Sequence, residues 1–345
     1  MTDPILSVSD LTVSFRSDGR WREVVHGVSF DVGPRETVAL VGESGSGKSV
    51  GMLALMGLVP HPGRVEADRL RFEGKDLQRL SQRERRALTG KDVAMIFQEP
   101  TTSLNPSFTI GYQLAETLRI HEGMDRKAAR RRVIELLEQV GIPAAESRLS
   151  AYPHQLSGGM NQRVMIAMAI ACNPKLLIAD EPTTSLDVTI QAQILDLLLS
   201  LQRDRGMALI LITHNMGVVS DTTERVAVMY AGQIMEMRPT QSLLESPQHP
   251  YTAALLAARP EASDGGRLAT IPGVVPGAYD RPRGCLFSPR CAYATPLSDE
   301  LRPDLRPWRD GLIRCHYPLG DSTREARRAA DGGDSAAANR REAVS

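Results

Sequence analysis

Short apolar runs separated by turn residues occupy the first 40 positions of the chain. The segments "LSVSDLTVSF" and "VVHGVSFDV" alternate apolar and polar residues, which is typical of antiparallel strands. The run "ETVALVG" that follows is rich in β-branched residues and ends in glycine. It predicts a buried strand.

Helical and strand patterns then alternate along the chain. From Arg83 to Leu149 the pattern is mostly helical, and the helix "RKAARRRVIELLEQVG" has the stop signals Gly141 and Pro143 at its end. Two further apolar runs, "KLLIAD" and "ALILIT", predict strands on either side of a helix, "IQAQILDLLLSLQRDRG", with Gly206 past its end. Strands that alternate with helices predict an α/β fold with a parallel sheet.

The composition changes after Ala258. Proline and glycine become frequent in "PEASDGG", "IPGVVPG" and "DRPRG", which indicates an extension at residues 259–320. Residues 321–345 are polar and poor in aromatic residues, so a disordered tail is expected there.

Charge and cysteine content narrow the class of protein. Among 345 residues, 41 lysines and arginines balance 41 aspartates and glutamates, which disfavours a nucleic-acid partner. No run of eighteen apolar residues is present and the N-terminus lacks the pattern of a secretory signal, so we expect a cytoplasmic chain with no membrane span. In that compartment, clustered cysteines are more often metal ligands than disulfides.

The segment "GESGSGKS" fits the phosphate-loop pattern G-x-x-x-x-G-K-[ST] between a predicted strand and a predicted helix. Backbone N–H groups from Gly45 to Ser49 can surround phosphate oxygens at the positive end of a helix. The Lys48 ammonium can contact β- and γ-phosphates, and the Ser49 hydroxyl can ligate Mg²⁺. The predicted nucleotide-binding residues here are Gly42, Glu43, Ser44, Gly45, Ser46, Gly47, Lys48, Ser49 and Val50.

Two carboxylates follow the predicted strand "KLLIAD". Asp180 is suited to hold Mg²⁺ or its waters, and Glu181 is suited to orient and deprotonate the water that attacks ATP. A second anion site is predicted where Ser157, Gly158 and Gly159 open a long helix in "QLSGGMNQRVMIAMAIACNP".

These motifs, in this order, resemble the ATP-binding subunit of an ABC transporter, in which "LSGG" is the signature loop. The resemblance extends from the N-terminus to about Gly320. It implies a cassette at residues 1–258, made of a phosphate-loop core, an antiparallel β subdomain and a helical subdomain at about 98–175. It also implies ATP and Mg²⁺ as ligands.

Further roles are implied by the resemblance, residue by residue. Gln98 in "IFQEP" matches the glutamine that senses Mg²⁺ and water, and Asp187 in "SLD" matches the loop that links the two sites of a dimer. His214 in "LITHN" matches the switch histidine at the γ-phosphate. Phe15 stands where the family places an aromatic ring under adenine, with Trp21 as its rival.

The segments "FQEPTTSLNP", "YPHQLSGGM", "SPQHPYTAALL" and "CLFSPRCAYAT" are similar to the dipeptide/oligopeptide importer branch. Gln155 and Asn161 depart from that branch, which often has Glu and Arg at these places. Near relatives carry nickel or oligosaccharides, so these substrates stay open as alternatives.

The resemblance implies an ATPase at the cytoplasmic face of the inner membrane that energises peptide import. Its implied partners are two permease subunits, an extracytoplasmic binding protein and a second, homologous ATP-binding subunit. The resemblance implies that the two cassettes dock head to tail, which puts Ser157 and Gly159 on the partner's nucleotide. The family usually pairs two different ATPases, which favours a heterodimer. A soluble ABC ATPase and a regulatory cassette without hydrolysis are the competing classes.

The branch often carries four cysteines in the extension, which hold a [4Fe–4S] cluster. Cys285, Cys291 and Cys315 match three of them, and Ser298 stands at the fourth position. Three alternatives follow: a cluster with Ser298, Asp299 or His316 as the odd ligand, a zinc site of the three cysteines and His316, or thiols that only pack.

Overall fold

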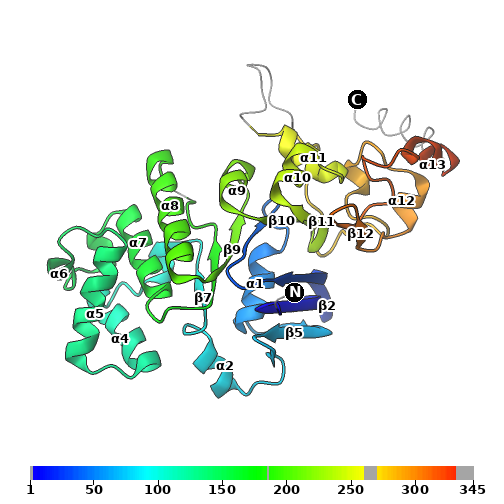
Figure 1. The fold of residues 1–345 in the computed structure, drawn as a ribbon. Helices are drawn as coiled ribbons and strands as arrows, with labels where there is room; N and C mark the ends of the chain where they lie inside the picture. Colours follow the sequence, from blue (N-terminus) through cyan, green and yellow to red (C-terminus); the bar gives the residue numbers. More distant parts are fainter. Residues whose placement is uncertain (1–2, 185, 260–269, 332–345) are drawn as a thin grey trace. The chain divides into compact units, whose positions relative to one another are not determined.

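The computed structural model describes residues 3–184, 186–259 and 270–331 (Figure 1), and this part of the chain divides into two compact units. The first unit comprises Met1–Ser7, Asp31–Thr37 and Arg71–Ile212. The second comprises Val8–Phe30, Val38–Leu70 and the described residues from Thr213 onwards. The domain limits at 258 and 320 stay predictions.

Three parallel strands form the sheet of the first unit, in the order β9–β8–β7. They are β7 (Val93–Ile96), β8 (Leu176–Asp180) and β9 (Ala208–Thr213). Ile178 in the middle strand pairs with Met95 on one side and Ile210 on the other. Every residue of β8 is buried, which explains why this strand reads as an unbroken apolar run and confirms the parallel sheet expected from the sequence.

Several helices accompany these strands in the first unit. They are α2 (Gln82–Leu88), α3 (Pro100–Ser103), α4 (Ile110–Glu122), α5 (Arg126–Gln139), α6 (Ala145–Arg148), α7 (Gly158–Ala169) and α8 (Val188–Arg205), with a 3-10 turn at Pro153–Gln155. Helices α4, α5 and α7 pack on one another (Figure 1). Their contact is apolar because Ala129, Val133, Leu136 and Leu137 recur at helical spacing on one face of α5. The predicted stop of α8 is confirmed, since Gly206 adopts a φ of 62° there.

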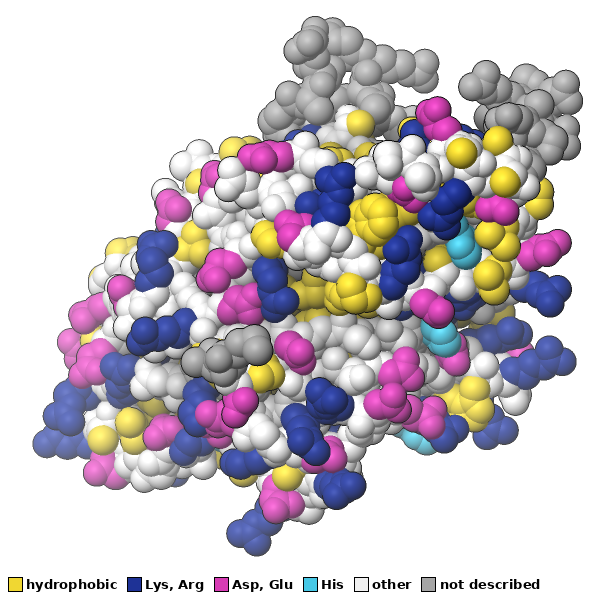
Figure 2. Space-filling view, turned by 45° about the vertical axis from the view of Figure 1, so that its right-hand side comes forward, with side chains coloured by type: hydrophobic (Ala, Val, Ile, Leu, Met, Phe, Trp, Pro, Cys, Tyr) yellow, Lys and Arg dark blue, Asp and Glu magenta, His cyan; other side chains and the backbone are white. Residues whose placement is uncertain are grey.

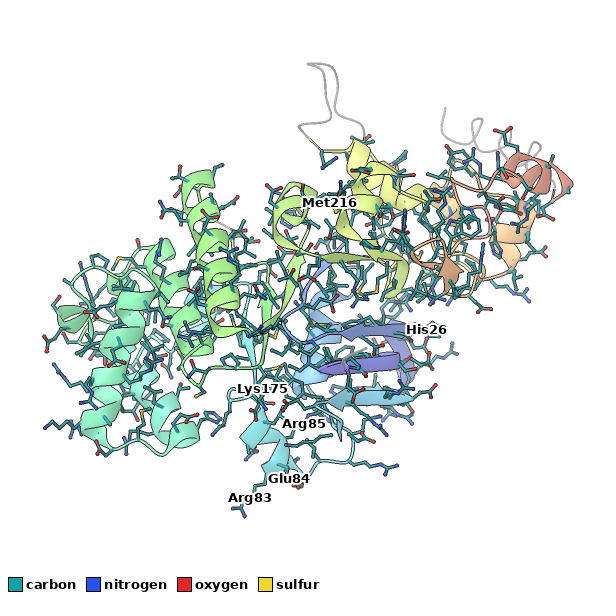
Figure 3. The ribbon with its side chains drawn as sticks, in the orientation of Figure 1. His26, Arg83, Glu84, Arg85, Lys175 and Met216 are labelled. Carbon is teal, nitrogen blue, oxygen red and sulfur yellow. The ribbon has the colours of Figure 1, made fainter. Side chains whose placement is uncertain are left out.

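Local polar contacts fix the ends of smaller elements in this unit. Helix α2 begins with a capping box: the Ser81 hydroxyl accepts from the Glu84 N–H at 3.3 Å, and the Glu84 carboxylate accepts from the Ser81 N–H at 2.8 Å. Just before β8, the Lys175 ammonium donates to the Glu73 carboxylate at 2.6 Å. Glu84 and Lys175 are labelled in Figure 3. The short strands β5 (Arg69–Phe72) and β6 (Lys75–Asp76) pair antiparallel through Arg71 and Asp76.

The N-terminal strands are antiparallel, as expected. Strand β1 (Leu6–Ser17) lies beside β2 (Arg20–Val32), and it also pairs antiparallel with β4 (Gly63–Glu66), where Val13 faces Val65.

A second set of strands in the second unit has the order β12–β13–β11–β10–β3. Strands β3 (Thr37–Val41) and β10 (Arg225–Tyr230) are parallel, and β11 (Gln233–Pro239) runs antiparallel to β10. The last two strands, β13 (Gly311–Ile313) and β12 (Arg306–Trp308), come from the extension and continue the sheet by antiparallel pairing. The extension is therefore built into the sheet of this unit.

Among the described residues of this unit, five α-helices and a 3-10 turn accompany these strands before the tail. They are α1 (Lys48–Met56), α9 (Met216–Thr222), α10 (Thr240–Glu245), α11 (Pro250–Ala257), α12 (Pro296–Glu300) and the turn Ser288–Arg290. The extension also shares the core, because the Phe287 ring lies 5.3 Å from the rings of Tyr230 and Tyr251, between centroids. Cys285 and Leu286 are buried in the same cluster.

The tail differs in part from the sequence-based expectation of disorder at residues 321–345. Arg324–Ala330 forms helix α13, whose arginines and alanines favour helix formation. Arg324 and Arg328 lie over the Tyr293 ring at 4.6 and 5.4 Å, which holds the helix against the extension. Residues 332–345 and the segment "PEASDGG" lie outside the described residues.

Charges of both signs are interspersed over the visible face, as Figure 2 shows, in keeping with the balanced composition. Within the described residues, no helix is both long enough and apolar enough to cross a membrane.

Candidate nucleotide site

The phosphate loop connects β3 to α1, as the sequence predicted. Gly42 has a φ of 153°, and a Cβ atom there would lie 2.1 Å from the Met229 carbonyl oxygen, so only glycine fits. Gly47 has a φ of 91° and precedes α1 without any side-chain cap. Helix α1 therefore begins at the end of the loop, and the partial positive charge of its N-terminus favours an anion there.

Lys48 is buried within this loop, with 5% of its surface exposed. Its ammonium donates to the carbonyl oxygens of Gly42 at 2.8 Å and Glu43 at 3.0 Å, and to the Ser46 hydroxyl at 3.1 Å. The loop's own oxygens thus fix the cation in its concavity, where a phosphate group would meet it.

Residues that sequence reasoning did not single out hold the loop from outside. The Glu43 N–H donates to the Tyr251 hydroxyl at 3.0 Å, and the Gly232 N–H donates to the Ser46 carbonyl oxygen at 2.9 Å. The Glu43 carboxylate pairs with Arg290 of the extension. Tyr251 lies in the family segment "SPQHPYTAALL", but no local signal connects residues more than 180 positions apart in the chain.

The other predicted residues of the second unit are His214, Phe15 and Trp21. His214 is exposed directly after β9, and Asn215 beside it caps α9 by accepting from the Gly217 N–H at 2.9 Å. Phe15 is half-buried on β1, opposite Gly63 of β4. Trp21 is 48% exposed on β2. Of the two aromatic residues, Trp21 is the more exposed.

The first unit brings Glu181 and Gln98 together beyond the end of β8. Glu181 has a φ of 44°, a left-handed conformation that costs energy in a residue other than glycine and that often marks functional sites. Its carboxylate oxygen Oε2 accepts from the Thr184 hydroxyl at 2.9 Å and from the Gln98 side-chain amide at 3.4 Å. Asp180, the last residue of β8, is 4% exposed. Thr184 is a further residue that the sequence did not single out.

The signature residues open α7 in the same unit, as predicted. Ser157 caps the helix by accepting from the Met160 N–H at 3.3 Å, and Ser157 and Gly158 are exposed. A Cβ atom at Gly159 would lie 3.2 Å from a methyl group of Ile190 in α8. Asp187 caps α8 by accepting from the Ile190 N–H at 3.0 Å.

The two departures from the family pattern have local structural roles. Gln155 accepts from the Tyr152 N–H at 2.9 Å, and buried Asn161 donates to the Pro153 carbonyl oxygen at 3.0 Å. Both contacts shape the turn that precedes the signature residues.

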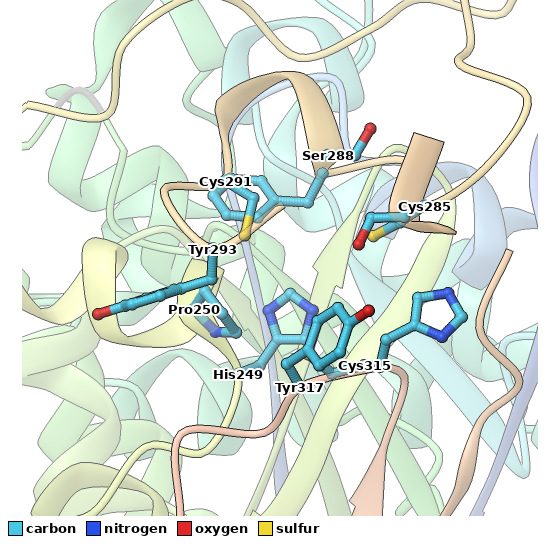
Figure 4. Close-up of a pocket in the computed structure, with 11 residues that line it drawn as sticks. His249, Pro250, Cys285, Ser288, Cys291, Tyr293, Cys315 and Tyr317 are labelled. Atoms are coloured by element: carbon cyan, nitrogen blue, oxygen red, sulfur yellow. The ribbon is translucent and has the colours of Figure 1, made fainter. Parts of the chain in front are cut away.

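The three cysteines of the extension line one pocket, together with Ser298 and His316 (Figure 4). Burial raises the pKa of the Cys285 and Cys315 thiols. His316 Nε2 lies 2.9 Å from the Leu301 carbonyl oxygen, and the Ser298 hydroxyl lies 3.4 Å from that of Thr295. Over the described residues, no group of three or more His, Cys, Asp or Glu side chains is arranged to hold a metal ion. As arranged, the pocket does not fit the cluster or the zinc site that the resemblance offered.

Comparisons with known proteins agree with this architecture. A family model described as ABC transporter matches residues 25–184, and one described as the oligopeptide/dipeptide transporter C-terminal region matches residues 235–297. The Escherichia coli K12 dipeptide transport ATP-binding protein DppD is 56% identical over 322 residues, 93% of this chain and 98% of that protein. The Haemophilus influenzae protein of the same name is 54% identical over 92% of this chain and 96% of its own length.

Among solved structures, the dimeric ATP-binding cassette MJ0796 in a post-hydrolysis state bound to ADP and Pi matches with a TM-score of 0.59. It is 26% identical and covers 68% of this chain and 98% of its own length.

Proposed function

The chain belongs to the ATP-binding subunits of ABC transporters, in the dipeptide/oligopeptide branch, and we propose that its ATP hydrolysis drives import of dipeptides or short oligopeptides. The observation that carries this proposal is that one chain matches both the cassette and the C-terminal region. Over 93% of this chain, the sequence is 56% identical to that of a dipeptide transport protein.

In the proposed reaction, Lys48 binds the β- and γ-phosphates. Ser49 and Asp180 would hold Mg²⁺, which would neutralise negative charge on the phosphate oxygens. Water attacks the γ-phosphorus while Glu181 accepts its proton. The bond to the β–γ bridging oxygen breaks, and ADP and phosphate leave. The Thr184 and Gln98 contacts orient the Glu181 carboxylate for this step. His214 contacts the γ-phosphate and Phe15 the adenine.

We propose that the chain works at the cytoplasmic face of the inner membrane with two permease subunits and a second, homologous ATP-binding subunit. An extracytoplasmic binding protein supplies the peptide. The two cassettes dock head to tail, so that Ser157 and Gly159 act on the nucleotide of the partner. The exposure of Ser157 and Gly158 at the start of α7 supports this role, because a partner chain can reach them.

For the cysteine pocket we propose a packing role. Cys285 is buried against the aromatic cluster of Tyr230, Tyr251 and Phe287, and Cys291 packs against the same cluster. Strand pairing through β13 and this shared core already tie the extension to the sheet, so no metal is needed to hold it there.

The test of the transport function is copurification of the chain from membranes, followed by peptide uptake in a deletion strain. We expect two permease subunits and a second ATPase to copurify, and uptake of dipeptides to be lost on deletion. Lost uptake of nickel or of oligosaccharides, with normal peptide uptake, would assign the other substrates. A chain that copurifies with no membrane subunit would contradict transport and favour a soluble ABC ATPase.

A further inference from the structure

We propose that Arg290, in the C-terminal extension, is a positioning residue of the phosphate loop and acts through Glu43. This proposal deepens the proposed ATPase function and rests on it. It assigns to the extension a part in ATP binding, separate from any contact with transporter partners.

Arg290 and Glu43 form a two-pronged ion pair. Nη1 of Arg290 lies 2.7 Å from Oε2 of Glu43, and Nη2 lies 3.0 Å from Oε1. The Arg290 side chain is 5% exposed and that of Glu43 is 29% exposed. A paired geometry of this kind, shielded from water, is stronger and more directional than an ion pair on the surface.

Contacts within the second unit, other than the pair with Glu43, also fix the Arg290 guanidinium. Nε donates to the Pro272 carbonyl oxygen at 2.7 Å, and Nη2 donates to that of Ile271 at 3.1 Å. The group also lies 5.7 Å from the centre of the Tyr230 ring. Because these contacts leave the guanidinium little freedom, Arg290 sets the position of the Glu43 carboxylate.

The backbone of Glu43 contacts the groups proposed to bind phosphate, so the position of Glu43 affects theirs. Its carbonyl oxygen accepts from the Lys48 ammonium at 3.0 Å and from the Ser46 N–H at 3.2 Å. Its N–H donates to the Tyr251 hydroxyl at 3.0 Å. A shift of the Glu43 backbone would therefore move the acceptor that holds Lys48 in the concavity of the loop.

The extension also contacts the strand that packs against the other end of the loop. Arg281 donates to the Val24 carbonyl oxygen at 2.9 Å, and a Cβ atom at Gly47 would lie 3.2 Å from the same oxygen. The Tyr279 hydroxyl bonds to that of Ser17, at the end of β1. These contacts place the extension against both the start of the loop and its helical end.

The test uses Arg290→Ala, Glu43→Gln and the double variant in the full chain. Binding of a fluorescent ATP analogue is measured on the isolated chain, and KM and kcat for ATP on the complex copurified from membranes. We expect each single variant to weaken analogue binding and raise KM about tenfold, with kcat within about twofold of wild type. That is the loss of about 1.4 kcal/mol of binding, in the range of a charged hydrogen bond.

Because the two residues act as one pair, the double variant is expected to lose about tenfold, not about a hundredfold. Arg290→Lys, which keeps the charge but not the two-pronged geometry, is expected to give an intermediate loss. The matched control is Arg302→Ala. Arg302 donates only within the extension, to the carbonyl oxygens of Gly284 and Pro282, among the contacts of the described residues.

Unchanged KM in a folded Arg290→Ala chain would overturn the proposal, as would an equal rise in KM for Arg302→Ala. A hundredfold loss in the double variant would also overturn it, because independent effects multiply. If Arg290→Ala fails to fold, Arg290→Lys and Glu43→Gln decide the matter by the same readouts. Failure of the wild-type chain to bind the analogue would instead contradict the proposed ATPase function itself.

Discussion

Replacement of Glu181 by glutamine removes one ionisable group and very little else. Glutamine has nearly the same shape as glutamate, and its carbonyl oxygen can still accept from the Thr184 hydroxyl, now 2.9 Å from the carboxylate. The Gln98 side-chain amide donates to the same oxygen at 3.4 Å, so a carbonyl oxygen at that place can keep both contacts. What disappears is the ability to accept a proton from the attacking water.

The size of the rate loss follows from the role of Glu181 as general base. Loss of a general base slows a reaction by about 10²- to 10⁴-fold. This corresponds to a barrier raised by about 2.7–5.4 kcal/mol. Thr184→Val removes one hydrogen bond to the charged carboxylate, worth about 1.5 kcal/mol, and predicts about a tenfold loss. ATP affinity should change less than about threefold in both variants, because neither residue is assigned to phosphate binding.

The assay is steady-state phosphate release by the complex copurified from membranes, with analogue binding measured in parallel. Glu146→Gln serves as the matched control, because Glu146 pairs with Arg130 at the surface of the same unit and should leave the rate unchanged. The reasoning is refuted if Glu181→Gln retains a rate close to that of wild type. If Thr184→Val slows release as much as Glu181→Gln, orientation of the carboxylate and not proton transfer would be the main contribution.

Other parts of the chain give further expectations. Gly159→Asp should leave analogue binding to the isolated chain intact but abolish hydrolysis by the complex, because a carboxylate would face the partner's γ-phosphate. If the isolated chain lost analogue binding as strongly as the complex lost hydrolysis, action in trans would be contradicted. Anaerobically purified chain should contain far less than one iron or zinc per molecule, and one zinc or several irons per chain would disprove the packing role of the three cysteines. Burial lowers the pKa of His249 to about 3, whereas an exposed histidine has a pKa of about 6.5. As pH drops, the unfolded state therefore binds a proton before the folded state does. The free energy of unfolding should fall between pH of about 6.5 and about 3. Thermal unfolding of His249→Asn, which keeps an acceptor for the Tyr251 N–H, should depend less on pH across that window, and an identical dependence would contradict the assignment.

Local patterns in the sequence determined the helices and strands and the residue types of the nucleotide motifs. The apolar run of β8, the glycines around Lys48 and the serine that caps α7 each specify their structure within a few residues, because strand burial, backbone freedom and capping act locally. The same motifs, in their order along the chain, were enough to identify the family.

Tertiary structure decided how distant segments support those motifs. In the sequence, the extension looked like a separate proline-rich segment. In the structure, its strand β13 pairs with β11, and its Arg290 forms an ion pair with Glu43, which lies 247 positions earlier in the chain. The cysteines do gather in one pocket, where Cys285 belongs to the aromatic core and Cys291 packs against it, and no metal-binding group is found among the described residues. No periodicity or motif encodes such pairings, because they depend on which surfaces the chain buries together once it has folded.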